Sequence, residues 1–130
     1  MKKSLGAIVC LLLLATHGVD AFPGDLVIMQ GLDKVTARVS TFQALLGATV
    51  RFGTLEITVK SCDRTPPEEP PESAVFLEVM EKRPEEPVTE LFTGWMFSSS
   101  PALSALEHPV YDVWVLECKR TVEVETEKGR

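Results

Sequence analysis

The stretch FTGWMFSSSPALSALEHPVYDVWVLEC, residues 92–118, predicts two strands joined by a short helix. Its two ends, within residues 91–98 and 110–118, carry apolar side chains at both alternating positions. That pattern is typical of strands that are covered on both faces. The stretch also contains both tryptophans and the only tyrosine of the chain. We therefore expect these two strands to be central to the fold.

The segment between the two strands predicts the helix. Ser100 is a favoured N-cap residue, and Pro101 is favoured at the first helical position. His108 precedes a proline, and residues in that position avoid helical geometry. We expect a helix of about two turns that starts after Ser100 and ends near Glu107.

Alternating apolar residues predict further strands. Residues 34–41, 54–60 and 74–81 each place apolar side chains at every second position. A tight turn or bulge at Gly53-Thr54 would place the apolar side chains of residues 50–59 on one face. The whole pattern predicts a mainly β fold, a small antiparallel barrel or sandwich of about six strands with one short helix.

Two acidic segments rich in proline, residues 63–73 and 83–87, separate the expected strands. Proline lacks a backbone donor and favours extended geometry, so both segments are expected to be exposed loops. Such loops can recruit a basic partner or a proline-binding module. Solvated connections are the commoner role of segments with this composition, and we favour that interpretation.

The N-terminus has the pattern of a secretory signal peptide. Lys2 and Lys3 precede an apolar run, and small residues before Phe22 predict cleavage after Ala21. We divide the chain into a signal peptide (1–21), a single β-rich domain (22–120) and a charged flexible tail (121–130). The apolar run is too short to span a bilayer, so we expect a periplasmic protein without membrane insertion after cleavage. An uncleaved anchor is the alternative.

Two cysteines remain after the predicted cleavage, which removes Cys10. A disulfide between Cys62 and Cys118 is the expected state in an oxidising compartment. A metal site or a redox pair is disfavoured, because neither cysteine has a partner at C-x-x-C or C-x-x-H spacing. Cys62 has the polar parity of its strand, so we expect the strand to end or bend near Ser61.

The charge and the motifs exclude several functions. The formal net charge is −6 at pH 7, which opposes binding to nucleic acid or to anionic lipid. The chain has no glycine-rich phosphate-binding loop, and we expect no cofactor.

His108 is the candidate for chemistry, with Glu107 and Asp112 close in sequence and serines at 98–100. A Ser-His-Asp arrangement is disfavoured because the Gly-x-Ser-x-Gly elbow is absent. Zinc binding by Glu107, His108 and Asp112 is also disfavoured, because zinc sites usually hold more nitrogen or sulfur. We expect no catalytic or metal site and favour a structural role for the imidazole.

Trp95, Trp114 and Tyr111 are candidates for an aromatic platform that binds a glycan, a peptide or an apolar ligand. Tryptophans in the strands of a small domain more often belong to the core. If instead Trp95 and its neighbours form an exposed apolar patch, they indicate a protein partner. The candidate ligand or partner surface therefore comprises Trp95, Tyr111 and His108.

Residues 94–118, together with QGLDKVTAR (30–38) and VRFGTL (50–55), resemble a family of small exported alphaproteobacterial proteins. The family is catalogued as domain of unknown function 2155. The resemblance implies a periplasmic single-domain protein and marks Cys62 and Cys118 as the cysteine positions of the family. It implies no activity, ligand or catalytic residue.

Three functions follow, in order of preference. The first is a non-enzymatic periplasmic domain that binds a protein or a component of the cell envelope. The second is a small-molecule or glycan-binding module that uses an aromatic platform around Trp95. The third is a hydrolase or a metal site centred on His108. The sequence leaves the partner and the oligomeric state open.

Overall fold

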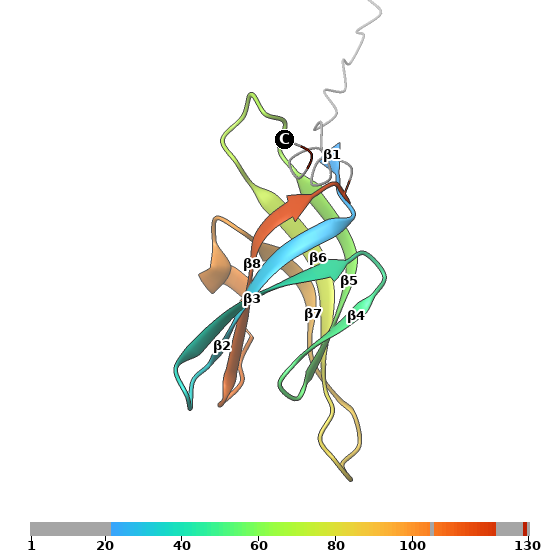
Figure 1. The fold of residues 1–130 in the computed structure, drawn as a ribbon, viewed down its shortest axis with the longest axis vertical. Coiled ribbons are helices and arrows are strands. Elements are labelled where there is room, and N and C mark those ends of the chain that lie inside the picture. The colour runs from blue at the N-terminus through green and yellow to red at the C-terminus, as the bar shows by residue number, and fades with distance from the viewer. Residues whose placement is uncertain (1–21, 105, 122–128, 130) are drawn as a thin grey trace, which may run out of the picture.

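The computed structural model describes residues 22–104, 106–121 and 129 (Figure 1). This part of the chain forms eight strands and one short 3₁₀ helix. The strands are β1 (Phe22–Pro23), β2 (Leu26–Asp33), β3 (Arg38–Leu45), β4 (Thr49–Phe52), β5 (Leu55–Arg64), β6 (Ser73–Glu81), β7 (Thr89–Phe97) and β8 (Tyr111–Lys119), and the 3₁₀ helix is η1 (Pro101–Ser104).

The strands form two antiparallel sheets. One sheet has five strands in the order β1-β5-β6-β7, with β4 also paired to β5, and the other has three strands in the order β3-β2-β8. Figure 1 shows the second sheet lying across the first. The expected antiparallel β fold is confirmed as a sandwich-like pair of sheets. The barrel alternative is wrong, because the two sheets are not joined edge to edge by continuous strand pairing.

The core lies between the two sheets. The predicted inward-facing residues of β5 and β6 are completely buried, and they pack against inward-facing residues of β2 and β8. Burial of each such Val, Leu or Ile side chain contributes roughly 1.5–3 kcal/mol. The inward set comprises Leu55, Ile57, Val59, Val75, Leu77, Val79, Val27, Met29, Val113 and Val115.

The tight turn predicted at Gly53-Thr54 is confirmed. Phe52 pairs with Leu55, so β4 and β5 form a hairpin with a two-residue connection. Gly53 has a φ of 59°, and a positive φ at the first central position is what a type II′ turn requires. This turn places the apolar side chains of both strands on the same face, as the sequence predicted.

The bend predicted near Ser61 is confirmed as a β-bulge. The register between β5 and β6 shifts between Val59 and Ser61, and β5 then continues to Arg64. A bulge inserts one residue and so reverses the side-chain parity of the positions that follow. For this reason Cys62, which has the polar parity in the sequence, lies in the core.

The strand predicted for residues 34–41 is wrong in its first half. Residues 34–37 form the turn between β2 and β3, and Val35 is 78% exposed. The Asp33 Oδ1 atom accepts hydrogen bonds from the N–H groups of Val35 and Thr36, at 2.9 and 3.2 Å. An aspartate that bonds to the backbone in this way favours a turn over a strand, and Ala37 completes the turn at a φ of 58°.

The two-turn helix predicted up to Glu107 is also wrong in length. Only Pro101–Ser104 form a 3₁₀ turn, and residues 106–108 are not helical. Tertiary contacts compete with the local helix signals here, because Leu106 is buried in the core and the imidazole of His108 bonds to Glu81 at the end of β6. In the described part of the chain, no helix is long and apolar enough to cross a membrane.

The prediction that residues 91–98 and 110–118 are covered on both faces is wrong for their outer faces. Trp95 on β7 is 42% exposed, and Leu116 on β8 is 40% exposed. Both strands lie in sheets of a two-layer structure, so only one face of each is covered by the other sheet. The exposed side chains on the outer faces are therefore available for contacts outside the domain.

Candidate functional site

The outer face of β6 and β7 carries an aromatic pair. In the register of these strands, Phe76 lies opposite Trp95 and Ala74 lies opposite Phe97. The alternate residues of β6 face the core, so these four side chains lie on the outer face. The rings of Phe76 and Trp95 pack edge to face, with centroids 5.3 Å apart. We call these four residues the outer aromatic face.

Polar side chains border the outer aromatic face on one side. Thr58 and Thr93 flank Glu78 on neighbouring strands, and Glu78 forms an ion pair with Lys60 at 3.6 Å. These groups lie in the cross-strand row next to the aromatic pair, so the apolar centre has a polar rim on that side. Protein interaction sites commonly have this arrangement.

Tyr111 and Trp114 are not part of that face. Both belong to β8 in the other sheet, where Trp114 lies opposite Gln30. The Tyr111 ring packs between the sheets, 5.5 Å from the ring of Phe52 and 5.2 Å from the imidazole of His108. The structure therefore assembles no platform from Trp95, Trp114 and Tyr111, and of these three side chains only Trp95 is exposed.

His108 lies at the end of β6, where only 6% of the residue is exposed. Its Nδ1 atom accepts hydrogen bonds from the N–H groups of Val110 and Tyr111, both at 3.0 Å. Since Nδ1 is an acceptor, the ring proton is on Nε2, which donates to Glu81 Oε2. Both ring nitrogens are thus occupied, and neither has a lone pair free for a metal or for a substrate proton.

Glu81 collects further donors beside His108. The Thr54 hydroxyl donates to its carboxylate at 3.0 Å, and Arg83 forms an ion pair with it at 3.0 Å. Burial acts to raise the pKa of Glu81, but the hydrogen bonds from His108 and Thr54 outweigh it and hold that pKa below its ordinary value. The Lys34 ammonium donates to the backbone carbonyl of His108 at 2.8 Å. These contacts hold the His108 ring and backbone in place and support a structural role for this residue.

The serines upstream of η1 bond elsewhere. Ser98 Oγ donates to Glu72 Oε1 at 3.0 Å, and the Ser99 hydroxyl donates to the other oxygen of the same carboxylate. Asp112 lies opposite Leu32 on β2. In residues 22–104, 106–121 and 129, no group of three or more His, Cys, Asp or Glu side chains is placed to hold a metal ion. The structure therefore does not assemble a Ser-His-Asp set around His108.

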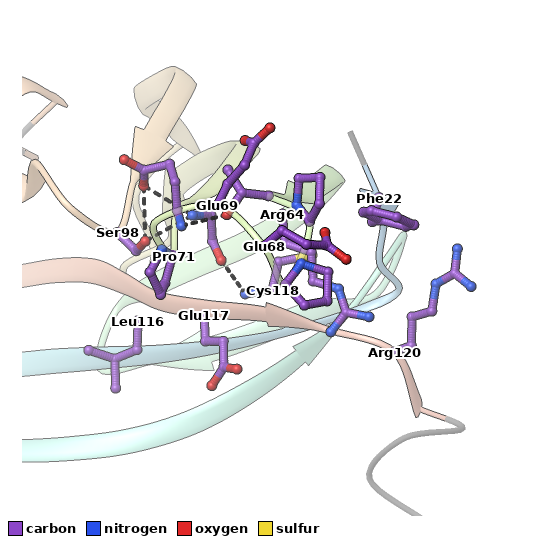
Figure 2. Close-up of a pocket in the computed structure, with 15 residues that line it drawn as sticks. Phe22, Arg64, Glu68, Glu69, Pro71, Ser98, Leu116, Glu117, Cys118 and Arg120 are labelled. Carbon is purple, nitrogen blue, oxygen red and sulfur yellow. Dashed lines mark hydrogen bonds between the residues drawn. The ribbon is translucent and has the colours of Figure 1, made fainter. Parts of the chain in front are cut away.

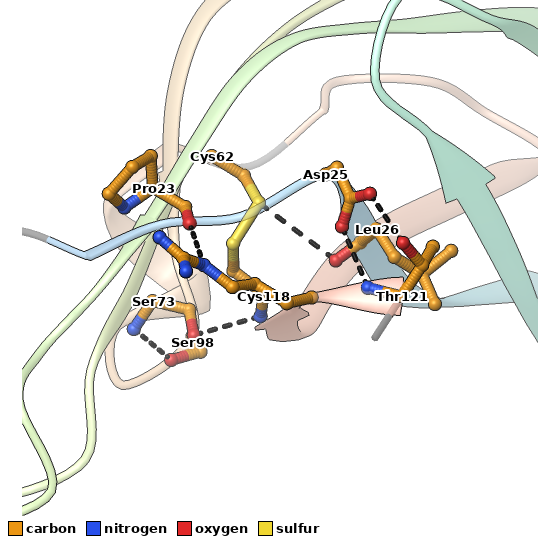
Figure 3. Close-up of a disulfide and its surroundings, with 9 residues drawn as sticks. Pro23, Asp25, Leu26, Cys62, Ser73, Ser98, Cys118 and Thr121 are labelled. Carbon is orange, nitrogen blue, oxygen red and sulfur yellow. Dashed lines mark hydrogen bonds between the residues drawn. A yellow bond between two sulfur atoms is a disulfide. The ribbon is translucent and has the colours of Figure 1, made fainter. Parts of the chain in front are cut away.

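The opposite end of the domain contains the disulfide (Figure 3). Cys62 on β5 is bonded to Cys118 on β8, so the bridge connects the two sheets and joins residues 56 positions apart. Gly24 passes directly over it. A Cβ atom at that position would lie 2.3 Å from Cys118 Sγ and 3.0 Å from Cys62 Sγ, so only glycine fits here.

The two ends of the domain meet over the bridge, in what we call the terminal clasp (residues 23–25 and 119–121). Gly24 N–H donates to the Cys62 carbonyl at 2.9 Å, and Arg120 Nε donates to the Pro23 carbonyl at 2.9 Å. The Asp25 carboxylate accepts from the hydroxyl and the N–H of Thr121, at 2.7 and 2.9 Å. Those two bonds hold the pKa of Asp25 below its ordinary value.

Glu72 organises the same end from the β6 side. Its carboxylate accepts from Ser98, from the N–H of Ser73 and from both the hydroxyl and the N–H of Ser99. Burial acts to raise the pKa of Glu72, but these hydrogen bonds prevail and lower it. Ser73 Oγ in turn accepts the Cys118 N–H at 2.9 Å. In the sequence, nothing distinguishes Glu72 from the other acidic residues of the loop, so its role was not predicted.

A groove of about 800 Å³ lies between the loop of residues 65–72 and the end of β8 (Figure 2). We call it the proline groove. Leu116, Glu117 and Arg120 line one side, and Cys118 contributes to its floor. Phe22 lies at one end of it. Sequence reasoning identified the proline-rich loop but not the groove, because the opposite wall comes from a strand distant in sequence.

These features define a small two-sheet β domain, joined by a disulfide, whose one histidine in the described residues has a structural setting. A family model described as "Uncharacterized protein conserved in bacteria (DUF2155)" matches residues 27–118, and the chain belongs to that family. The matched region runs from β2 to Cys118 and includes both bridged cysteines.

A curated relative is the uncharacterized protein RP359 of Rickettsia prowazekii (strain Madrid E), which is 31% identical over 87 residues. The match covers 67% of this chain and 56% of the relative, so the chain spans just over half of that protein's length. No solved structure matches the chain significantly.

Proposed function

We propose that this protein is a non-enzymatic periplasmic domain that binds a protein of the cell envelope through its outer aromatic face. The observation that carries the proposal is the 42% exposure of Trp95, next to Phe76, on a sheet face with a polar rim. Exposed tryptophans at the centre of an apolar patch are frequent anchors of protein interfaces.

The proposed location is supported by two features. The N-terminus has a basic start, an apolar run and small residues before Phe22, which is the pattern of a cleaved signal peptide. The disulfide between Cys62 and Cys118 is a second feature, since such bridges persist mainly in oxidising compartments. A periplasmic domain would meet its partner among the proteins of the envelope.

A non-enzymatic role is supported by the surroundings of His108. Its two ring nitrogens are bonded to Glu81 and to backbone N–H groups, and the nearby serines bond to Glu72. A general base needs a free nitrogen close to a substrate proton. Binding through Trp95 does not require any of these groups to react.

The test is site-specific photo-crosslinking in the native host. A photo-reactive residue at Thr93, on the polar rim of the outer aromatic face, is compared with one at Leu45, which is also exposed but lies on β3 in the other sheet. We expect one defined protein adduct from position 93 that is absent from position 45. In a Trp95→Ala background the adduct should fall at least tenfold, which corresponds to about 1.4 kcal/mol.

Three outcomes contradict the proposal. The first is no adduct at position 93, and the second is the same adduct at both positions. The third is an adduct that Trp95→Ala leaves unchanged while the variant keeps the wild-type unfolding midpoint. A saturable change of Trp95 fluorescence on addition of an envelope glycan, without a protein adduct, would favour the glycan-binding alternative.

A further inference from the structure

The proline groove has a preformed wall. The Thr65 N–H donates to the Glu72 carbonyl, the Glu72 N–H donates to Thr65 Oγ1, and Thr65 Oγ1 donates to the Pro70 carbonyl, each at 3.0 Å. Inside this closed loop, the Glu69 N–H donates to the Pro66 carbonyl at 3.0 Å. Prolines restrict the backbone further. A wall that is already ordered reduces the entropy that a ligand must overcome on binding.

The groove floor is rigid as well. Cys118 is fixed by the disulfide, and its N–H is bound to Ser73 Oγ at 2.9 Å. Ser73 is itself buried, and its N–H donates to both Ser98 Oγ and Glu72 Oε1. The loop, the floor and the β8 wall therefore hold their positions without a ligand.

The exposed surface of the groove is apolar and acidic. Phe22 and Leu116 are each 40% exposed, and exposed prolines of the loop add further apolar area. Glu68, Glu69 and Glu117 are exposed on the rim. A ligand would meet apolar contacts in the groove and carboxylates above them.

Two arginines, Arg64 and Arg120, line the groove and make contacts within the protein. Arg120 donates its Nε–H to the Pro23 carbonyl, and Arg64 is also bound within the protein. The Glu72 carboxylate stays ionised, because its hydrogen bonds from the serines favour the charged form, and it adds to the negative charge of the groove. Four carboxylates (Glu68, Glu69, Glu72 and Glu117) and two guanidinium groups (Arg64 and Arg120) line the groove, so its formal charge is −2 and the complementary ligand is cationic.

We propose that the proline groove binds an extended peptide segment of a partner protein, in which Lys or Arg side chains alternate with apolar ones. The apolar side chains would pack on Phe22, Leu116 and Pro67, and the cations would pair with Glu68, Glu69 and Glu117. A groove of about 800 Å³ has the size of sites that hold several residues of a ligand. This surface is separate from the outer aromatic face.

The chain contains a matched control for this proposal. The loop of residues 83–87 repeats the Pro-Glu-Glu-Pro pattern of residues 67–70, and Glu85 and Glu86 are exposed there too. That loop lies at the opposite end of the domain and does not line the proline groove (Figure 1). The pairs Glu68→Gln/Glu69→Gln and Glu85→Gln/Glu86→Gln change the net charge equally.

The experiment titrates the exported protein with a fluorescein-labelled peptide of alternating lysine and leucine and measures anisotropy. We expect saturable binding that Glu68→Gln/Glu69→Gln weakens at least tenfold, that Glu85→Gln/Glu86→Gln leaves within about twofold, and that Leu116→Ser weakens more than Leu45→Ser does. A peptide of alternating lysine and serine should bind at least tenfold more weakly.

Each of three results would overturn the proposal. One is binding of the lysine–leucine peptide weaker than about 1 mM. Another is an equal effect of the two glutamine pairs, which would indicate general attraction by net charge. A third is self-association that depends on Glu68 and Glu69, which would make a second copy of the chain the occupant. Trp95→Ala should leave peptide binding unchanged, so failure here and failure of the outer aromatic face are distinguishable.

Discussion

At the start of β6, the carboxylate of Glu72 accepts hydrogen bonds from the hydroxyl groups of two serines, and at its end the carboxylate of Glu81 accepts them from His108 and Thr54. The first end is also joined covalently by the disulfide, whereas the contacts described at the second end are all non-covalent, namely hydrogen bonds, an ion pair and ring packing. A glutamate carboxylate thus holds each end of β6 to its neighbours, but only one of the two ends also has a covalent link. The disulfide end therefore tolerates an open groove, whereas the stability of the His108 end depends on each of its contacts.

The disulfide end can carry an open groove because its stability does not depend on filling that space. The bridge fixes β5 to β8, and the terminal clasp covers it with backbone and side-chain hydrogen bonds. The loop of residues 65–72 is therefore free to form the wall of a groove. At this end, the structure leaves a surface for ligands.

The His108 end is filled by aromatic rings instead. Phe42 stacks on Phe52 at 5.6 Å, Phe52 packs edge to face with Tyr111, and Tyr111 stacks on His108. Gly31 leaves the space that Phe52 needs, since a Cβ there would lie 2.5 Å from the ring. Close packing of this kind makes each ring sensitive to substitution.

Removal of the disulfide should have the largest effect and should loosen one end only. For Cys62→Ala/Cys118→Ala, we expect a loss of about 4 kcal/mol of unfolding free energy, because the bridge closes a loop of 56 positions. Urea unfolding followed by circular dichroism measures the change. Reduced wild-type protein is the control and should match the variant. An unchanged midpoint would show that the bridge does not stabilise the fold.

His108→Ala should have the next largest effect and acts on the other end. The substitution removes the donor to Glu81 and the acceptor of two backbone N–H groups, and it leaves a cavity beside Tyr111. We expect a loss of about 3 kcal/mol. Urea unfolding checks it, with Glu107→Ala, an exposed neighbour, as the control. A change below about 0.5 kcal/mol would contradict the structural role of the imidazole.

Gly24→Ala sharpens the comparison by opening the cover of the disulfide. The added methyl group would overlap Cys118 Sγ and the Lys119 carbonyl oxygen, the latter at 2.6 Å, so the N-terminal strand must shift. We expect a loss of about 1–3 kcal/mol and faster reduction of the bridge by dithiothreitol. Gly94→Ala is the control, since its nearest neighbour is the edge of the Phe92 ring at 3.3 Å. Equal reduction rates would exclude shielding by the terminal clasp.

Low pH should weaken the contacts of the carboxylates at both ends of β6. This is the smallest of the predicted effects on stability. The pKa values of Glu72 and Glu81 lie below their ordinary value of 4.5 in the folded protein. Folding therefore favours the charged form of both groups, and the stability they contribute is complete above the unfolded pKa and lost as the pH falls through the folded pKa.

Glu72→Gln and Glu81→Gln should each flatten the fall of stability on the acid side. Unfolding free energies measured from neutral pH down to about pH 3 test this, with Glu85→Gln as an exposed control. An unchanged acid limb in both variants would mean that neither carboxylate is linked to folding.

Local sequence pattern predicted the parts of the fold that depend on neighbours in the chain. The alternation in β5 and β6, the hairpin at Gly53 and the inward turn of Cys62 all follow from parity and turn chemistry. The turn after β2 was missed because the Asp33 side chain bonds to the backbone, which outweighs the alternation of residues 34–41.

The candidate sites depended on contacts that local pattern does not encode. Glu72 meets Ser98 and Glu81 meets His108, in each case more than 25 positions away in the chain. The sequence did not determine whether Trp95 is exposed. A strand that is apolar on both faces does not reveal which face the second sheet covers. Cys62 and Cys118 were predictable because only two cysteines remain after the expected cleavage.

The outer aromatic face should be open in the free protein and covered by a partner in the complex. Acrylamide quenching in a Trp114→Phe variant isolates the fluorescence of Trp95, the other tryptophan of the chain. We predict strong quenching of Trp95 in the free protein and at least a severalfold weaker quenching in the complex with the protein crosslinked at position 93. A Trp95 that is already shielded in the free protein, or that is quenched equally in the complex, would contradict the account.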